Sequence, residues 1–403
     1  MAIASTTISS WEQLLEKARQ NTPARRVKRP GQAPSTTPIP SSLYKLPPER
    51  KPPVLLYRDS NSWCPFCERV WFALEEKQIP FETEFIDLSN KPKWYTDLVP
   101  TTLVPAAKIE GKLVYESKDI LLELEEHFGE TLLPEDPEEN AIARQWVEDA
   151  ETNGFRDIAY KFLRQPPEDA KELANLQAEF EAKLDEIEKT LGRYPKPYFL
   201  STFSLVDIMY SPHLDRLAAN LPVYRGYHIK GNPRFPLINV WFAALKKRPA
   251  YNRVKSDNIT NNLLLRRRFG IEPIGHPLPL DLAEAEFIEY RAEAAERLSD
   301  NREVAISDIL KNSGVQSLGD ISIIKDAVDF HLRLLADYLL NGNNELLPGG
   351  RTGGKESIDP IIAATGTITL AYIRNRICAP RDMSAGAATA LRAAADKVFA
   401  SIY

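Results

Sequence analysis

Cysteine is scarce in this sequence: only three of the 403 residues are cysteines, and two of these stand three positions apart. Three cysteines cannot form the disulfide framework of a secreted protein of this length, so we expect a reducing compartment. Histidine is also scarce, and the five histidines stand singly, without the spacing of metal ligands. We therefore expect no metal site.

Long apolar runs are absent too. No stretch is long enough to span a bilayer, and the first residues lack the pattern of a secretory signal. The formal net charge of -5 leaves no broad basic surface for nucleic acid, and the basic cluster at 25–29 is interpreted as solvated linker charge. We expect a cytoplasmic protein, with the chloroplast stroma as the alternative, and neither nucleic acid nor a membrane as partner.

Apolar residues make up 43% of the chain, which is enough for several buried cores. Residues 1–53 are predicted to form an N-terminal helix followed by a tether, because the stretch from residue 21 is dense in proline. The pattern changes at Val54. From there to residue 134, short strands and helices are expected in the order β-α-β-α-β-β-α, which is that of an α/β thioredoxin-like domain.

Strand patterns stop at Pro134, and amphipathic helices follow to the end of the chain. Residues 135–265 are predicted to form an all-α domain. A break rich in proline and glycine then opens residues 266–403, an additional all-α C-terminal extension of unknown role. Ser204 and Asp207 have the spacing of a reciprocal helix cap, for which we expect a structural role.

The pair Cys64 and Cys67 could be a redox pair, half of a metal site, or two buried thiols. A metal site is disfavoured because the third cysteine, Cys378, is far away in sequence. A cysteine at a helix N-terminus faces unpaired amides and the positive end of the helix dipole, which lower its pKa. Cys64 would then be the nucleophile and Cys67 would resolve a mixed disulfide, with Arg69 adding positive charge nearby. We favour the redox pair.

Four motifs extend this interpretation: C64-P65-F66-C67-E68-R69-V70, residues 87–95 (DLSNKPKWY), L103-V104-P105 and Y115-E116-S117. In order and spacing they resemble the cysteine-containing glutathione S-transferases of the omega and lambda classes. The resemblance continues to about residue 260 and implies a thioredoxin-like domain followed by the all-α C-terminal domain of these transferases. The extension, which neither class has, resembles the iota class and implies a photosynthetic organism.

The resemblance also implies glutathione as cosubstrate and a set of residues that bind it. Pro105 would be a cis-proline that exposes the backbone of Val104 to the cysteinyl part of glutathione. Glu116 and Ser117 would hold the γ-glutamyl group, and Lys91 the glycine carboxylate. Taken singly, these residues could instead be a loop proline, a helix cap and a surface charge. The full glutathione-binding set is Phe66, Lys91, Leu103, Val104, Pro105, Glu116 and Ser117.

A cysteine at the catalytic position implies thiol transfer and reduction, with weak conjugation. The expected reactions are deglutathionylation, dehydroascorbate-type reduction, or reduction of a glutathione adduct, through a mixed disulfide on Cys64. Cys67 departs from the alanine or serine common in omega and lambda members, which leaves open whether one thiol or two take part. Trp146, Phe155 and Tyr160 are expected to line the pocket for a small hydrophobic or disulfide acceptor.

A second hypothesis is a binding module for glutathione or another small molecule, whose C-terminal extension binds a ligand or a protein partner. A homodimer is an open alternative, because dimers are common in this fold. Residues 349–356 nearly match a phosphate-binding loop, but Glu356 replaces the required hydroxyl, so we expect an inter-helix loop. The arginines around Cys378, in residues 371–383, are expected to pair with charges at a helix end.

Overall fold

The computed structural model describes residues 8–21, 39–40, 52–129, 131–150, 152–165, 170–194, 197–276, 278–342 and 359–402. The chain divides into two compact units. One comprises residues 34–278, and the other joins residues 1–33 to residues 279–403. Each unit has its own hydrophobic core.

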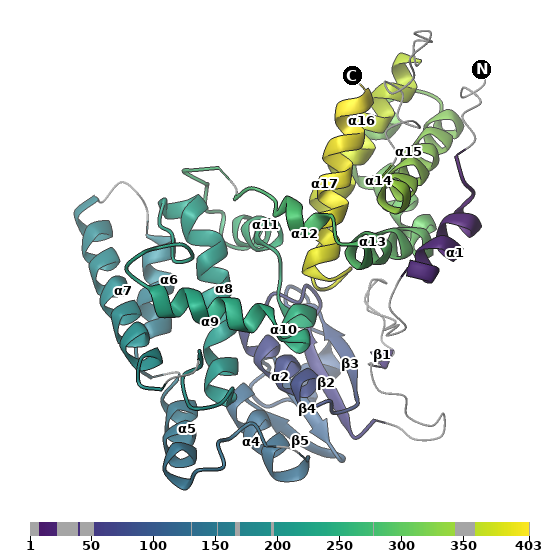
Figure 1. Cartoon of the computed structure of the whole chain (residues 1–403). Coiled ribbons are helices and arrows are strands. Elements are labelled where there is room, and N and C mark those ends of the chain that lie inside the picture. The colour runs from purple at the N-terminus through teal and green to yellow at the C-terminus, as the bar shows by residue number, and fades with distance from the viewer. Residues whose placement is uncertain are drawn as a thin grey trace. The chain divides into compact units, whose positions relative to one another are not determined.

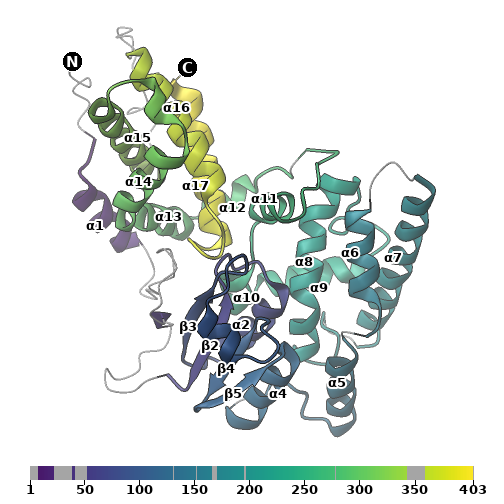
Figure 2. The same ribbon diagram turned by 180° about the vertical axis from the view of Figure 1, so that it is seen from behind.

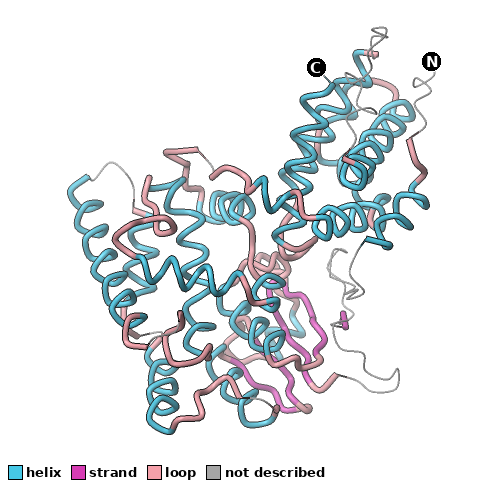
Figure 3. Tube along the Cα trace, viewed as in Figure 1, coloured by secondary structure: helices cyan, strands magenta, loops and turns pink. Residues whose placement is uncertain are grey.

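The first unit begins with a five-stranded mixed sheet in the order β1-β3-β2-β4-β5 (Figures 1 and 3). Strand β2 pairs in parallel with β3 and antiparallel with β4. This confirms the thioredoxin-like topology. The elements are β1 (Ile39–Pro40), β2 (Val54–Asp59), α2 (Pro65–Glu76), β3 (Phe81–Ile86), α3 (Lys93–Leu98), β4 (Ala106–Ile109), β5 (Lys112–Tyr115) and α4 (Ser117–His127).

The predicted tether needs one correction, because β1 lies within it. Ile39 and Pro40 pair antiparallel with Thr83 and Glu82 at the edge of the sheet. The alternation that would have indicated a strand cannot be recognised in a two-residue element beside several prolines. The remaining tether residues, 22–38 and 41–51, and the basic cluster among them, lie outside the described part of the chain.

Seven helices follow the sheet in the described part of this unit. They are α5 (Pro137–Asp149), α6 (Phe155–Arg164), α7 (Ala170–Leu191), α8 (Leu205–Arg225), α9 (Pro236–Lys246), α10 (Pro249–Val254) and α11 (Asn258–Phe269). Helix α8 is buried almost all round and starts with the predicted cap, in which Asp207 Oδ2 accepts from the backbone N–H of Ser204 at 2.9 Å. Asp207 also accepts from Trp241 Nε1 at 2.8 Å, so the cap has the structural role expected.

The second unit is a helical bundle built from both ends of the chain (Figures 1 and 2). Its described elements are α1 (Trp11–Asn21), α12 (Leu282–Ala285), α13 (Ile288–Asp300), α14 (Arg302–Asn312), the 3-10 helix η1 (Val315–Leu318), α15 (Ile321–Asn341), α16 (Pro360–Arg376) and α17 (Ala385–Ile402). The additional all-α region is thus confirmed. No helix in the described residues is both long and apolar enough to cross a membrane.

The sequence analysis grouped helix α1 with the tether in residues 1–53. In the structure, α1 packs against the C-terminal helices instead. Its buried face, Trp11, Leu14 and Ala18, belongs to the core of the second unit. Trp11 Nε1 donates to Asp329 Oδ1 of α15 at 2.7 Å. Residues 266–278, which were assigned to the extension, fall into the first unit. An apolar helix face shows that a partner exists but does not identify that partner.

The segment around Cys378 joins α16 to α17 and is held by the expected charge pairs. Arg374 pairs with Asp396 and Arg376 with Asp308. Cys378 is buried, and its backbone N–H donates to Asp382 Oδ2 at 2.8 Å. The segment therefore has a structural role. The sequence that resembles a phosphate-binding loop lies outside the described residues.

Candidate functional site

Cys64 stands at the start of helix α2, as the sequence predicted. It is the residue before the first helical position, Pro65, and its backbone is extended, with φ -64° and ψ 118°. Its carbonyl oxygen accepts from the backbone N–H of Glu68 at 3.1 Å, which opens the helix. The Cys64 thiol therefore lies at the end of α2 where backbone amides have no helical partner.

Cys67 lies one turn further into the helix and is more deeply buried, at 2% exposure against 9% for Cys64. Both thiols are free. Burial raises the pKa of the Cys67 thiol well above its usual range, and a hydrogen bond to Cys64 and the charges of Cys64 and Asp59 act in the same direction. Cys67 is therefore a protonated thiol at neutral pH.

The loop before β4 brings a second group of predicted residues to Cys64. The Sγ atom of Cys64 lies 3.9 Å from the carbonyl oxygen of Val104, and the Val104–Pro105 peptide bond is cis, as the resemblance implied. Leu103 is more than half exposed, and its carbonyl accepts from Tyr95 Oη at 2.5 Å. Lys91 Nζ donates to the carbonyl of Thr102 at 2.8 Å, which places the lysine beside the same loop.

Glu116 and Ser117 stand at the N-terminus of helix α4. Glu116 is exposed and has a positive φ of 70°, while Ser117 is buried. Arg69 Nη1 lies 3.5 Å from Ser117 Oγ, and Arg69 Nε donates to the carbonyl of Met209 at 3.0 Å. Arg69, which we expected only to add charge, thus also links α2 to α4 and α8.

Phe66 turns its ring toward the helical part of the unit. The ring centroid lies 5.4 Å from that of His213, in an edge-on arrangement. The guanidinium of Arg69 lies 5.1 Å from the ring centroid of Phe66, and that of Arg156 lies 5.9 Å from it. Phe66 therefore connects the expected glutathione-binding residues to α8, through His213, and to α6, through Arg156.

Two residues of α8 that the sequence analysis did not select lie at this site. Arg216 is buried, and its Nε donates at 2.8 Å to the carbonyl of Trp63, the residue before Cys64. Its Nη2 lies 2.8 Å from Oε2 of Glu68, which is also buried. Burial raises the pKa of Glu68 to about 7, although Arg216 opposes that shift.

His213 is the second. It is 3% exposed, its Nδ1 lies 3.3 Å from Tyr160 Oη, and its Nε2 has no hydrogen-bond partner among the described residues. Burial, followed by the charges of Arg69, Arg216 and Arg156, holds the pKa of His213 well below its usual range. The imidazole is therefore neutral. No sequence signal selects either residue, because α8 contains several other polar residues, among them Asp207, Asp215 and Asn220.

The expected pocket residues separate into two places. Tyr160 lies next to His213, whose ring centroid is 5.4 Å from that of Phe66 in the CPFC motif, and burial raises the pKa of Tyr160. Trp146 and Phe155 instead line a cavity of about 390 Å³ between α5, α7 and α8, whose lining contains neither Cys64 nor Tyr160. Their expected place in the acceptor site stays a prediction, because aromatic residues in amphipathic helices do not reveal which part of the fold they face.

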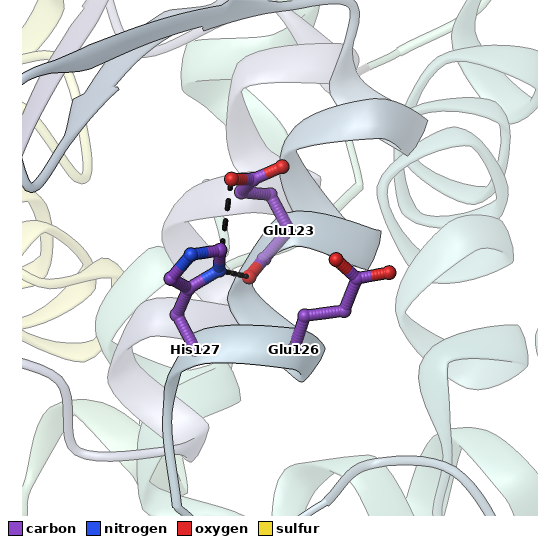
Figure 4. A group of neighbouring side chains, drawn as sticks. All are labelled: Glu123, Glu126 and His127. Atoms are coloured by element: carbon purple, nitrogen blue, oxygen red, sulfur yellow. Dashed lines mark hydrogen bonds and ion pairs between the residues drawn. The ribbon is translucent and has the colours of Figure 1, made fainter.

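Three residues on α4, Glu123, Glu126 and His127, bring potential metal ligands together (Figure 4). Glu123 already accepts from Lys112 Nζ at 2.7 Å. His127 Nδ1 lies 3.0 Å from the carbonyl oxygen of Glu123, within the same helical turn. Since the carboxylate and this ring nitrogen have protein partners, the group is explained as a solvated helix end and we assign no metal to it.

Two family models match the chain. "Glutathione S-transferase, N-terminal domain" matches residues 63–127, and "Glutathione S-transferase, C-terminal domain" matches residues 170–244. Both matches lie in the first unit, and the first of them includes Cys64, Val104 and Ser117. The first match ends with α4, and the second begins with α7 and ends within α9.

Curated proteins are similar over about half of the chain. Protein IN2-1 homolog A of Oryza sativa subsp. japonica is 35% identical over 200 residues, which are 48% of this chain and 78% of that protein. Glutathione S-transferase L1 of Arabidopsis thaliana is 30% identical over 201 residues, 48% of this chain and 79% of that protein. Glutathione S-transferase omega-1 of Sus scrofa is 30% identical over 207 residues, 51% of this chain and 82% of that protein.

These relatives are matched over more than three quarters of their own length. The similarity therefore extends to the sheet and the helices that follow it, and is not limited to a short motif. On this ground, together with the two family models, the chain belongs to the glutathione S-transferase family.

Proposed function

We propose that this transferase is a glutathione-dependent thiol transferase and reductase that works through a mixed disulfide on Cys64. The observation that carries the proposal is the position of the thiol, which lies at the N-terminus of α2 and 3.9 Å from the carbonyl oxygen of Val104. Amides at a helix N-terminus stabilise a thiolate, and a thiolate attacks disulfides. A cysteine here favours reduction over conjugation.

In the proposed reaction, the Cys64 thiolate attacks the glutathione sulfur of a mixed disulfide. A Cys64–glutathione bond forms, and the acceptor leaves as a thiolate that takes a proton from water. A second glutathione thiolate then attacks the adduct and releases oxidised glutathione. In the dithiol variant, Cys67 loses its proton, attacks Cys64, and releases reduced glutathione. Deglutathionylation and reduction of glutathione adducts follow this route. In dehydroascorbate-type reduction the acceptor carries no glutathione: it would take two electrons and two protons from the Cys64 thiol and one reduced glutathione, which join as the same mixed disulfide.

Glutathione would bind along the loop before β4 and at the N-terminus of α4. The backbone N–H and C=O of Val104 would pair with the cysteinyl residue, as in strand addition. Lys91 Nζ has three donors, so it can contact the glycine carboxylate while keeping its bond to Thr102. Glu116 would hold the ammonium and Ser117 the γ-glutamyl carboxylate, with Phe66, Leu103 and Pro105 completing the site.

The finer classification is part of the same proposal. Cys64 and the second helical unit favour a cysteine-type transferase similar to the iota class of photosynthetic organisms. The compartment would be the cytoplasm, or the stroma if the source is a plastid-containing cell. A small hydrophobic or disulfide acceptor and a homodimer are the expected partners.

The test is the mass of the protein after incubation with oxidised glutathione. Wild type is compared with Cys64→Ser, Cys67→Ser and, as a matched control, Cys378→Ser. We expect a glutathione adduct that persists in Cys67→Ser, disappears in Cys64→Ser and is unaffected in Cys378→Ser. Collapse to an internal disulfide in wild type would indicate the dithiol route. If Cys64 takes no glutathione in any variant, the proposal fails and a binding module becomes the better explanation.

A further inference from the structure

One face of helix α6 presents two arginines around Tyr160. Arg156, Tyr160 and Arg164 are four residues apart, so they lie on the same side of the helix. The Arg156 guanidinium lies 5.9 Å from the ring centroid of Phe66, in the CPFC motif. Tyr160, between the two arginines, has its Oη 3.3 Å from Nδ1 of His213, whose ring centroid lies 5.4 Å from that of Phe66.

Arg164 stands between aromatic rings. Its guanidinium carbon lies 5.6 Å from the ring centroid of Tyr160 and 5.1 Å from that of Phe269. The Phe269 ring in turn lies 5.9 Å from Trp63, the residue before Cys64. Trp63 precedes α2, Tyr160 lies on α6 and Phe269 on α11, so rings from three parts of the first unit form an aromatic wall around Arg164.

Near these rings, not every arginine is paired with a carboxylate. Arg164 Nε donates to the carbonyl of Tyr160 at 3.1 Å, and in the described part of the chain no carboxylate pairs with Arg164. Arg156 pairs with the exposed carboxylate of Asp157 at 3.1 Å. Glu68 is buried and pairs with Arg216. Among the described residues, Nη1 and Nη2 of Arg164 have no hydrogen-bond partner, and these two groups can bind a planar anion through two hydrogen bonds.

We propose that Arg164, supported by Arg156, selects acceptors that carry a carboxylate on a planar apolar body. The inference rests on the proposed function, since it names the acceptor that leaves when Cys64 attacks the glutathione sulfur. The rings of Trp63, Tyr160 and Phe269 would contact the apolar body, and the Arg164 guanidinium its carboxylate. A carboxylate of glutathione itself could also bind to Arg164. The test therefore uses substrates that have the same glutathione half.

The test uses two mixed disulfides of glutathione, one with 4-mercaptobenzoate and one with 4-mercaptobenzamide. They share the glutathione half and the ring, and differ in the charge of the acceptor. We measure kcat/KM for both substrates and take the ratio of acid to amide. Dividing it by the same ratio of the uncatalysed rates with free glutathione gives the corrected preference, which removes the difference in intrinsic reactivity. The variants are Arg164→Gln and Arg156→Gln. Lys161→Gln is the matched control, because it removes a positive charge from an exposed position on the same helix, about 100° around the helix axis from Tyr160.

In wild type we expect a corrected preference for the acid of about three- to tenfold, falling with added salt. Arg164→Gln should bring it close to one, Arg156→Gln should lower it less, and Lys161→Gln should leave it unchanged. A corrected ratio near one in wild type, or one that Arg164→Gln does not change, overturns the inference. Failure of the proposed function is distinguishable, because Cys64 would then form no glutathione adduct with either substrate.

Discussion

Glu68 and Arg216 form a buried ion pair, 2.8 Å between Oε2 and Nη2, that joins helix α2 to helix α8 one turn after Cys64. Arg216 also holds the carbonyl of Trp63 at 2.8 Å. The Arg216 guanidinium therefore holds both Trp63, the residue before Cys64, and the first turn of α2. The pair acts on both the stability of the first unit and the position of Cys64.

Arg216→Leu should consequently cost both stability and activity. Removing one partner of a buried pair typically costs about 3 kcal/mol, because the other partner is left without compensation. The free energy of unfolding is measured with urea, and formation of the Cys64 adduct by mass. In the double variant Arg216→Leu, Glu68→Leu, we expect part of the stability to return but not the adduct rate. An unchanged adduct rate in Arg216→Leu would show that the pair does not position the thiol.

Cys67 should react slowly with iodoacetamide in the folded protein at pH 7. Its pKa is raised by burial, so little thiolate is present, and the buried sulfur is hard to reach. Peptide mapping after timed alkylation measures the rate at each cysteine, with urea-unfolded protein as the reference. We expect Cys64 to be labelled first. Equal rates at both thiols would contradict the depth difference seen in the structure.

His331 should make the second unit less stable in acid. It is 1% exposed, and burial lowers its pKa below 6.5. The unfolded chain therefore binds a proton more readily, so the contribution of His331 is fully present above about pH 6.5 and is lost as the pH falls toward the folded pKa. Urea midpoints between pH 8 and pH 5, followed by a probe in the second unit, should fall less steeply in His331→Leu. The same slope in both proteins would contradict the assignment.

Leu14 and its neighbour Leu15 provide a matched pair for the placement of α1. Leu14 is 1% exposed in the core of the second unit, whereas Leu15 is only half-buried. Leu14→Ala should lower the free energy of unfolding of that unit by about 2–4 kcal/mol, and Leu15→Ala by much less. Denaturation of the full chain and limited proteolysis of the C-terminal helices report the difference. Equal, small effects would mean that α1 does not belong to this core.

Much of the fold could be predicted because it depends on neighbouring residues. The order of strands and helices from Val54, the cap formed by Ser204 and Asp207, and the place of Cys64 at a helix start all follow from local periodicity and from the geometry of helix ends. The arginines around Cys378 are different, since Asp396 and Asp308, the partners of Arg374 and Arg376, lie on other helices. The strand and helix order, the cap and the helix start each depend on residues that lie within a few positions of one another in the sequence.

Other features were decided only by the tertiary structure. An apolar face on α1 requires burial, but long-range packing selected the C-terminal helices as its partner. Trp146 and Phe155 line a cavity whose lining lacks Cys64. Arg216 and His213 come from α8, more than a hundred residues further along the chain, and contact Trp63 and Phe66 beside the two cysteines. Sequence patterns specify which side chains must be buried, whereas the crossing of helices determines which of them meet.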